Sequence, residues 1–435
     1  MKRKVYDSLL AWKSKPVGKR KPLLLEGARQ TGKTWLAREL GHREFEELVE
    51  VNFEDDEQML RLFEADFDVE RVLTTLRLST GKRIEPGKTL IFLDEIQQAR
   101  RGLLALKYFF DKAPEYHVVA AGSLLGVVDH KDDSFPVGKV DFLAVHPLSF
   151  EEFLWAVGKE GMAEMLHKQD WTAVNAFSDK YIGLLRSYFF VGGMPEAVLT
   201  YAEEGDFNAV REVHKDLLKS YEHDFSKHPP KEVVKRMELL WKSIPSQLAR
   251  ENRKFVYTAI RESARSREFE TAIQWLCDAG MAHKVTRINA GELPLRVFET
   301  PEAFKLYVID VGLHGAMSGL DARTLLSGNE FFGQYKGALT EQFVLQELCC
   351  MDETEIHYWT PDAGKAEVDF VIQQNGMVIP IEVKAEQNLK AKSLGEFVKK
   401  YAPQRVIRTS LAPYSKGAVV TDLPLFAIGL LPELR

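Results

Sequence analysis

The sequence contains little cysteine and no long apolar run. Its 435 residues include only 3 cysteines, Cys277, Cys349 and Cys350, and no C-x-x-C pair. This excludes a disulfide framework and a four-cysteine zinc site, and it predicts a reducing, cytoplasmic environment. No apolar stretch approaches the length of a membrane span, and the basic residues 1–4 precede no apolar core of a secretory signal. We therefore expect neither a signal peptide nor a membrane partner.

The chain also lacks an excess of positive charge. It has 58 Lys and Arg residues against 64 Asp and Glu residues, a formal net charge of −6. A nucleic-acid partner would therefore have to bind a local basic patch. Hydrophobic residues make up 45% of the sequence, and there are no internal repeats or low-complexity tracts. This composition predicts several folded domains.

Residues 1–150 alternate between short apolar runs and amphipathic helical patterns. Helical patterns cover residues 33–40 and 101–112. This alternation predicts an α/β domain with a parallel sheet. Four apolar runs have the length and composition of its buried strands: residues 22–25, 48–53, 89–93 and 117–121.

The segment between the first predicted strand and the first predicted helix fits the pattern G-x-x-x-x-G-K-[ST]. Its glycines let backbone N–H groups face phosphates, and the following helix adds the positive end of its dipole. The lysine would reach the β- and γ-phosphates, and the final threonine would bind Mg²⁺. The motif thus predicts a site for ATP and Mg²⁺. It consists of Gly27, Ala28, Arg29, Gln30, Thr31, Gly32, Lys33 and Thr34.

Polar residues follow the next two predicted strands. Asp94 and Glu95 come directly after the strand at 89–93. Asp94 is expected to hold Mg²⁺ and Glu95 to activate the attacking water, which favours hydrolysis over transfer to a small substrate. Ser123 follows the strand at 117–121. It is placed either to sense the γ-phosphate or to cap a helix.

From about residue 150 the pattern becomes helical. Residues 255–285 carry three short helical patterns, and a hairpin of residues 282–285 with 295–299 would complete a winged helix. This mildly basic module either contacts a phosphate backbone or covers the ATPase as a lid.

Helices are predicted over residues 149–157, 173–190, 207–223 and 233–248. The predicted domains are an ATPase domain (1–150), a helical, lid-like region (151–245), a winged-helix module (246–302) and an α/β domain (303–435).

The last predicted domain contains an acidic hairpin. Residues 375–376 are Asn-Gly, the strongest two-residue hairpin signal. A two-residue loop places Asp369 opposite Glu382 and Glu367 opposite Lys384. These four side chains share one face because the side-chain period of a strand is two.

Two carboxylates that face each other across a strand pair repel, and a divalent cation would remove that repulsion. Asp369 and Glu382 therefore predict a site for a second Mg²⁺ or for Mn²⁺, and Glu341 on the preceding helix could add a ligand. Lys384 could position water or stabilise the transition-state charge. This D-x12-E-x-K pattern is that of phosphodiester cleavage in restriction-type nucleases. The alternative is a solvated amphipathic hairpin.

Seven segments together resemble the prokaryotic AAA-type ATPases that carry a C-terminal restriction-endonuclease-like domain of unknown function. The resemblance covers nearly the whole chain and implies that fold. Where the family usually has arginine after a glycine, this chain has Lys139. Lysine keeps the positive charge, but it cannot donate two parallel hydrogen bonds to one phosphate as a guanidinium does. Either Lys139 or an arginine from a neighbouring subunit would complete the ATPase site. The segments are residues 25–34, 52–54, 93–97, 121–123, 147–153, 192–197 and 381–384.

Two functions follow from these predictions. The first is an ATPase that is coupled to the processing of DNA or RNA by the nuclease-like domain. The second is a nucleotide-driven switch or scaffold, whose nuclease-like domain only binds protein partners or further copies of the chain. A small-molecule kinase is disfavoured by the Asp94–Glu95 pair.

Overall fold

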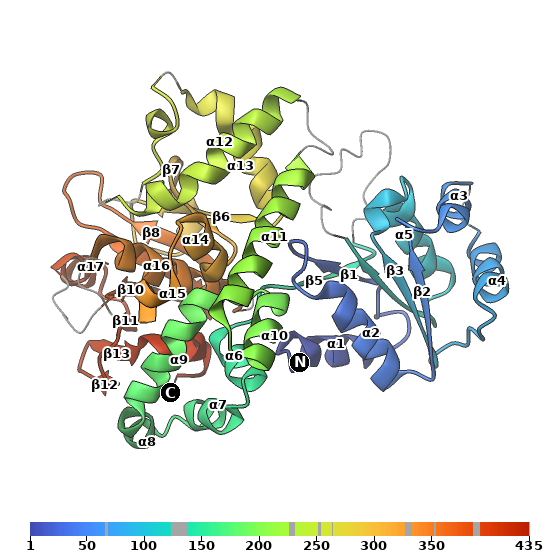
Figure 1. Cartoon of the computed structure of the whole chain (residues 1–435), viewed down its shortest axis with the longest axis horizontal. Helices are drawn as coiled ribbons and strands as arrows, with labels where there is room; N and C mark the ends of the chain where they lie inside the picture. The colour runs from blue at the N-terminus through green and yellow to red at the C-terminus, as the bar shows by residue number, and fades with distance from the viewer. Residues whose placement is uncertain are drawn as a thin grey trace. The chain divides into compact units, whose positions relative to one another are not determined.

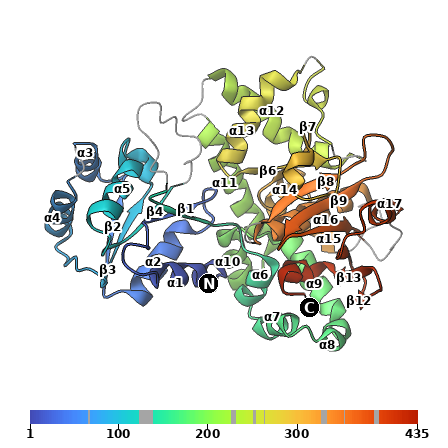
Figure 2. The same ribbon diagram turned by 180° about the vertical axis from the view of Figure 1, so that it is seen from behind.

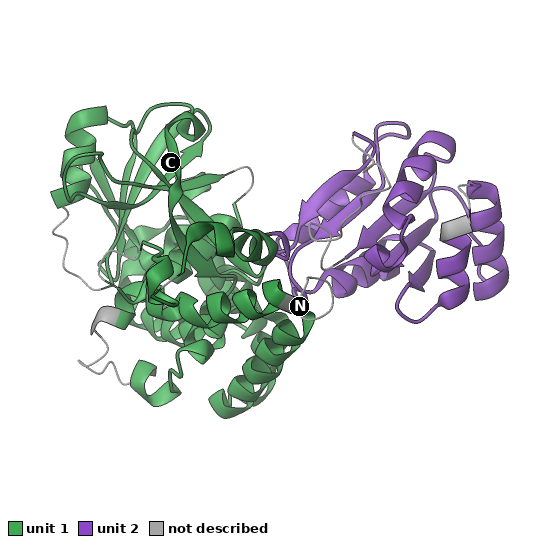
Figure 3. Cartoon of the chain, turned by 90° about the horizontal axis from the view of Figure 1, so that it is seen from above, with its two compact units in different colours: residues 1, 147–277, 281–435 green, residues 2–146, 278–280 purple. Residues whose placement is uncertain are grey.

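The computed structural model describes residues 1–434 in two compact units. Unit 2 comprises residues 2–146 and 278–280, and unit 1 comprises residue 1 and residues 147–277 and 281–435 (Figure 3). The further division of unit 1 into three domains stays a prediction. The description leaves out residues 66–67, 123–137, 226–230, 251–253, 263, 327–332, 352–353, 386–391 and 435.

Unit 2 is built on a parallel sheet of five strands in the order β2-β3-β4-β1-β5 (Figure 1). The predicted α/β fold is confirmed here, and all four predicted strands are present. The edge strand β5 was not predicted, because its four residues alternate between partly buried and exposed positions. The strands are β1 (Leu23–Glu26), β2 (Glu47–Asn52), β3 (Thr89–Asp94), β4 (His117–Ala121) and β5 (Asp141–Ala144).

Helices cover both faces of this sheet because its strands are apolar on both sides. Helices α3, α4 and α5 cover one face of the sheet, and α1 and α2 cover the other (Figure 2). Leu24 of β1 packs in the first of these cores, whereas its neighbours Leu23 and Leu25 pack in the second. The sheet is therefore fixed between two apolar layers, and only the strand ends are left for polar chemistry. The helices are α1 (Val5–Lys13), α2 (Lys33–Glu44), α3 (Glu57–Ala65), α4 (Val69–Thr80) and α5 (Gly102–Lys112).

Unit 1 contains a mixed sheet of eight strands in the order β12-β13-β11-β10-β9-β8-β6-β7. The Asn-Gly hairpin lies at its centre as β9 and β10. The strands are β6 (Ala282–Ile288), β7 (Glu299–Val308), β8 (Glu355–Trp359), β9 (Val368–Gln374), β10 (Met377–Val383), β11 (Val406–Ser410), β12 (Ser415–Lys416) and β13 (Val420–Pro424).

The predicted wing of the winged helix is not a separate hairpin. β6 pairs with β7, but it also pairs in parallel with β8, so both strands belong to the eight-stranded sheet. The predicted strand at 295–299 is wrong, because residues 295–298 form a short 3₁₀ helix. Leu295 is fully buried in the core beside β9, and its N–H donates to the side chain of Gln373. This tertiary anchor outweighs the β preference of a short apolar run.

The helices of unit 1 include all four that were predicted between residues 149 and 248, with a break at Phe177 that splits the second into two. The helices are α6 (Phe150–Ala156), α7 (Glu160–His167), α8 (Trp171–Ala176), α9 (Ser178–Val191), α10 (Pro195–Glu204), α11 (Phe207–Phe225), α12 (Lys231–Leu248), α13 (Ser266–Asp278), α14 (Val311–Met317), α15 (Ala322–Leu326), α16 (Gly333–Cys349) and α17 (Lys392–Tyr401).

The Gly-Gly turn between α9 and α10 packs on a buried aspartate. Asp310 is fully buried, accepts the N–H of Gly193 at 2.6 Å and caps α14 through the N–H of Leu313 at 2.9 Å. A side chain on Gly192, whose φ is +71°, would collide with the Asp310 carboxylate. Gln346 of α16 also donates to Asp310, at 3.1 Å. The glycines are therefore required by close packing of the helices.

Candidate nucleotide site and acidic hairpin

The loop between β1 and α2 has the geometry expected of a phosphate-binding loop. Gly32 has a φ of +96° and directly precedes α2, so the loop turns into the helix N-terminus. Gly27 has a φ of +137° and packs so closely on the carbonyl of Val145 that a side chain there would collide with it. Both glycines are thus required by the backbone. The N–H groups of the first helical turn lack helical acceptors and favour an anion.

Lys33 is buried at the start of α2. Its ammonium donates to the loop carbonyls of Gly27 and Ala28, at 2.9 and 2.7 Å. Burial lowers the pKa of Lys33 to about 8, while the charges of Glu95 and Asp94 act in the opposite direction. These contacts hold the side chain against the backbone of the loop.

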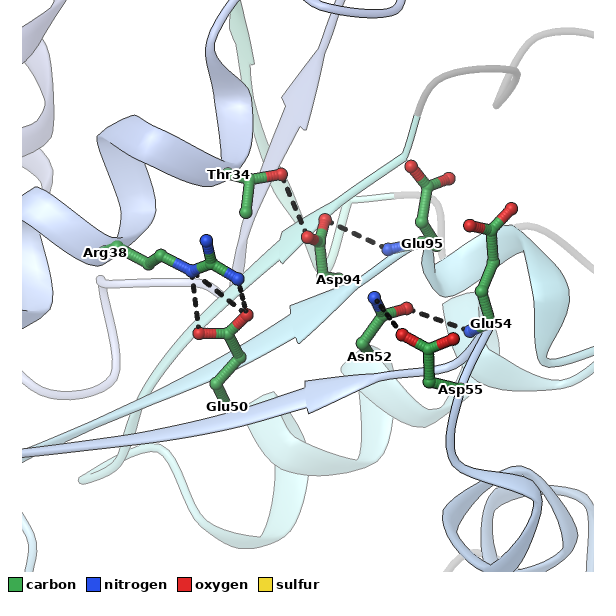
Figure 4. Close-up of polar contacts among 8 residues, drawn as sticks. All are labelled: Thr34, Arg38, Glu50, Asn52, Glu54, Asp55, Asp94 and Glu95. Atoms are coloured by element: carbon green, nitrogen blue, oxygen red, sulfur yellow. Dashed lines mark hydrogen bonds and ion pairs between the residues drawn. The ribbon is translucent and has the colours of Figure 1, made fainter.

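Thr34 and Asp94 form the second part of this site (Figure 4). The hydroxyl of Thr34 donates to the carboxylate of Asp94 at 2.9 Å. Burial raises the pKa of Asp94, and the hydrogen bond from Thr34 opposes that rise. A buried carboxylate and a hydroxyl in contact at the end of β3 are hard oxygen donors, which suits Mg²⁺. The residues present therefore fit the predicted cation.

Glu95 follows Asp94 in an unusual backbone conformation, with a φ of +51°. The side chain of Gln97 donates a hydrogen bond to its carboxylate. At the end of the neighbouring strand β2, the side chain of Asn52 accepts the N–H of Glu54 at 2.9 Å (Figure 4). The left-handed backbone conformation turns the chain at Glu95, directly after β3. Glu95 therefore lies at the carboxyl ends of the strands, where parallel sheets bind ligands.

No sequence pattern indicated the role of Arg3. Its guanidinium is buried and donates to the carbonyl of Thr31 in the phosphate-binding loop at 3.1 Å, and to the carbonyl of His146 at 2.7 Å. Arg29 of the loop forms an ion pair with Glu54 at 3.7 Å. Arg3 therefore ties the loop to the segment that follows β5.

Two further predicted residues of the ATPase site have different outcomes. Ser123 lies outside the described residues. Lys139 forms an ion pair with Asp111 of α5 at 2.7 Å, and its ammonium lies 5.0 Å from the centre of the Phe110 ring. In this conformation Lys139 is engaged by α5, so its role as a substitute for the family arginine stays a prediction.

The acidic hairpin has the predicted register. Gln374 pairs with Met377, and Phe370 pairs with Ile381. One residue further along, this register brings Asp369 opposite Glu382, as predicted. The carboxylate of Asp369 accepts the N–H of Val383, the residue after Glu382, at 2.8 Å.

Glu382 is the most perturbed carboxylate of the hairpin. Burial, together with the nearby charge of Asp369, raises the pKa of Glu382 to about 7. Lys384 donates to one of its oxygens at 2.6 Å. The other oxygen is buried, and no described residue donates a hydrogen bond to it. An orphaned carboxylate oxygen beside a second carboxylate fits a hard divalent cation.

Glu341 lies near a buried lysine that no sequence pattern indicated. Lys305 of β7 is fully buried, with its ammonium 2.7 Å from the carboxylate of Glu367 and 3.7 Å from that of Glu341. The hydroxyl of Tyr307 also donates to Glu341, at 3.2 Å. Within the described ranges, no three His, Cys, Asp or Glu side chains are grouped as metal ligands. The role of Glu341 as a third metal ligand thus stays a prediction.

Three family models match separate parts of the chain. Residues 19–154 match an AAA domain, residues 182–324 match a domain of unknown function (DUF8612), and residues 336–428 match another (DUF4143). The AAA match spans the phosphate-binding loop, Asp94 and Glu95. Residues 19–154 therefore form an AAA-type P-loop ATPase domain, which binds nucleotide.

Solved structures with partial similarity to this chain include the following three. The Walker-type ATPase PABY2304 of Pyrococcus abyssi has 16% identity and a TM-score of 0.43, and the match covers 73% of this chain and 95% of that one. The Thermotoga maritima RuvB Holliday junction branch migration motor has 14% identity, a TM-score of 0.29 and coverages of 65% and 89%. PCH-2 of C. elegans has 14% identity, a TM-score of 0.28 and coverages of 48% and 66%. A comparison with curated proteins found no match.

The described helices also bear on the membrane prediction. None of them combines the length and the apolar character needed to cross a bilayer.

Proposed function

We propose that this protein is a Mg²⁺-dependent ATPase whose ATP cycle is coupled to nucleic-acid processing by unit 1. The observation that carries the proposal is the presence of two sets of phosphate chemistry in one chain. One is the phosphate-binding loop with the Thr34–Asp94 pair. The other is the acidic hairpin, where Glu382 keeps a buried oxygen without a described donor.

In the ATPase domain, the loop and the N-terminus of α2 bind the phosphates, and Lys33 moves its ammonium from the loop carbonyls to the β- and γ-phosphates. Thr34 and Asp94 would hold Mg²⁺, which would supply positive charge to offset the charge that develops on the phosphates. Glu95 orients a water for attack on the γ-phosphorus and accepts its proton. Gln97, by its hydrogen bond, limits the directions in which the Glu95 carboxylate can point.

In unit 1, Asp369 and Glu382 would hold Mg²⁺ or Mn²⁺, which would supply the Lewis-acid chemistry needed to activate a water. Lys384 lies against Glu382 and carries the positive charge that would stabilise the phosphorane-like transition state. The side chain of Lys384 is partly exposed, so it can reach a substrate without breaking the fold.

The second candidate function is a nucleotide-driven switch or scaffold with an inactive nuclease-like domain. The observation that favours it is the pairing of the acidic residues with lysines. Lys384 already lies 2.6 Å from Glu382, and Lys305 lies 2.7 Å from Glu367. These ammonium groups compensate much of the charge that would otherwise attract a cation.

A nuclease assay separates the two functions. Purified protein is incubated with Mg²⁺ or Mn²⁺, with and without ATP, on single- and double-stranded DNA and RNA. The control variant is Glu355→Gln, because Glu355 of β8 is a carboxylate that pairs with Arg296 outside the hairpin. Cleavage that is lost in Asp369→Asn but kept in Glu355→Gln supports the nuclease. Loss of the ATP effect in Lys33→Met shows that ATP controls the activity. Absence of cleavage on every substrate favours the switch or scaffold.

A further inference from the structure

The turn that follows α13 belongs to the same unit as the phosphate-binding loop. Most of α13 and all of β6 are parts of unit 1, but residues 278–280 between them are part of unit 2. The N–H of Met281 donates to the carbonyl of Leu276 at 2.9 Å and closes the turn. Gly280 has a φ of +69°, the left-handed conformation that commonly ends a helix. The chain thus passes from unit 1 into unit 2 and back within three residues.

Within unit 2, Gly280 packs directly on the backbone of the phosphate-binding loop. A Cβ atom at Gly280 would lie 2.9 Å from the nitrogen of Ala28 and 3.5 Å from the carbonyl carbon of Gly27. These two atoms belong to one peptide group. Gly27 also packs on the carbonyl of Val145, with no room for a side chain. The first peptide group of the loop is therefore packed against two other segments and has little room to shift.

The same loop residue contacts the lysine of the nucleotide site. The carbonyl of Ala28 accepts hydrogen bonds from the ammonium of Lys33 at 2.7 Å and from the hydroxyl of Thr31 at 3.0 Å. In the proposed ATPase mechanism, Lys33 leaves this carbonyl when it binds the phosphates. Ala28 is fully buried, so the loss of a charged donor would change the hydrogen bonding that fixes its backbone. Phosphate binding would thus act on the residue that Gly280 contacts.

The other end of the turn leads into the large sheet of unit 1. The carbonyl of Met281 accepts the N–H of Ile309, which follows β7, at 3.0 Å. Strand β6 begins at Ala282 and pairs with β8, and β8 in turn pairs with β9 of the acidic hairpin. A shift of the turn would therefore act on a continuous, hydrogen-bonded set of strands that ends at the hairpin.

We propose that Gly280 is a positioning residue of the nucleotide site, and that its turn transmits phosphate binding from the loop to α13 and β6. The inference deepens the proposed function, on which it rests for the coupling between ATP and unit 1, by naming the segment that connects them. Glycine is required at this position for two reasons. The backbone is left-handed, and any side chain would collide with the loop.

The first test compares two glycines that end helices. Gly280→Ala would place a methyl group against the nitrogen of Ala28. The matched control is Gly205→Ala, because Gly205 ends α10 with a φ of +68° and its Cβ position has no described atom within 4 Å. Both variants strain the backbone alike, so both should lower the melting temperature to a similar degree.

Binding of the slowly hydrolysed analogue ATPγS with Mg²⁺, measured by titration calorimetry on the full chain, separates positioning from stability. We expect Gly280→Ala to weaken this binding about tenfold or more, because a small misplacement of the loop is costly for its ligand. Gly205→Ala should bind as tightly as the wild type. A merely structural role of Gly280 would lower the melting temperature and leave the affinity unchanged, and that result would overturn the positioning role.

The second test follows amide hydrogen exchange in the wild type, with and without ATPγS and Mg²⁺, and does not depend on the folding of any variant. We expect the nucleotide to change the exchange rates of peptides from the end of α13 and from β6. In Gly280→Ala at saturating nucleotide, this change should be lost, whereas Gly205→Ala should retain it.

Two outcomes of the exchange experiment would overturn the inference in different ways. If the nucleotide changes exchange in unit 1 equally in the wild type and in Gly280→Ala, the coupling of the proposed function stands, and the turn is not its route. If the nucleotide changes exchange in the phosphate-binding loop and α2 but in no peptide of unit 1, the coupling fails and the inference fails with it.

Discussion

Replacement of Lys305 by methionine should destabilise unit 1 strongly, although methionine has nearly the same length. The Lys305 ammonium is fully buried and lies 2.7 Å from Glu367 and 3.7 Å from Glu341. Removal of one partner from a buried ion pair leaves an uncompensated charge, which costs about 3–5 kcal/mol. Lys284→Met is the matched control on the neighbouring strand β6. Its exposed ammonium lies over the Phe304 ring, and its loss should cost about 1 kcal/mol or less.

Hydrogen exchange of backbone amides measures this effect locally, in peptides from β7 and α16. The expected loss of stability corresponds to an increase of more than a hundredfold in the rate of amide exchange. The double variant Lys305→Met with Glu341→Gln should recover part of the loss, because it removes a charge that the lysine had compensated. A loss of less than about 1 kcal/mol in the local unfolding free energy of Lys305→Met would contradict this prediction, because it would mean that these carboxylates do not need the ammonium.

Three further predictions concern single residues. Glu95→Gln should bind ATP with normal affinity but hydrolyse it about a hundredfold or more slowly, as measured by nucleotide binding and phosphate release, because only the proton acceptor is lost. Burial lowers the pKa of His214 to about 4, so the unfolded state gains the proton first. The stability of unit 1 should therefore fall by about 3 kcal/mol as the pH falls from 6.5 to 4, and His214→Gln should show a weaker pH dependence in urea titrations. Gly192→Ala should lower the melting temperature by several degrees, because its methyl group meets the Asp310 carboxylate.

Local sequence patterns were sufficient to predict the phosphate-binding loop and the register of the hairpin. The loop is contiguous, and its chemistry depends on the backbone of residues 27–34. The hairpin register follows from the Asn-Gly turn alone, so the Phe370–Ile381 pairing could be derived without knowledge of the fold. Both features depend on neighbours in the sequence, which is the information that residue patterns contain.

Features that depend on distant contacts could not be predicted. The predicted pairing of residues 282–285 with 295–299 was wrong, because residues 282–285 pair with residues 305–308 of β7. β6 also pairs with β8, which comes from a later part of the chain. No sequence pattern indicated a role for Lys305, because Glu341 of α16 and Glu367, directly before β9, approach it only in the folded unit. Arg3 likewise meets Thr31 and the distant His146 only in the folded domain. In each case the sequence pattern around the residue is ordinary, and tertiary packing decides its role.

The rate of ATP hydrolysis as DNA or RNA is added to the purified chain with Mg²⁺ tests the proposed coupling most directly. Lys33→Met gives the background rate. We predict that nucleic acid raises the rate of the wild type several-fold and leaves that of Lys33→Met at background. An ATPase rate that is the same at every concentration of DNA and RNA would contradict coupling between the nucleotide site and nucleic acid.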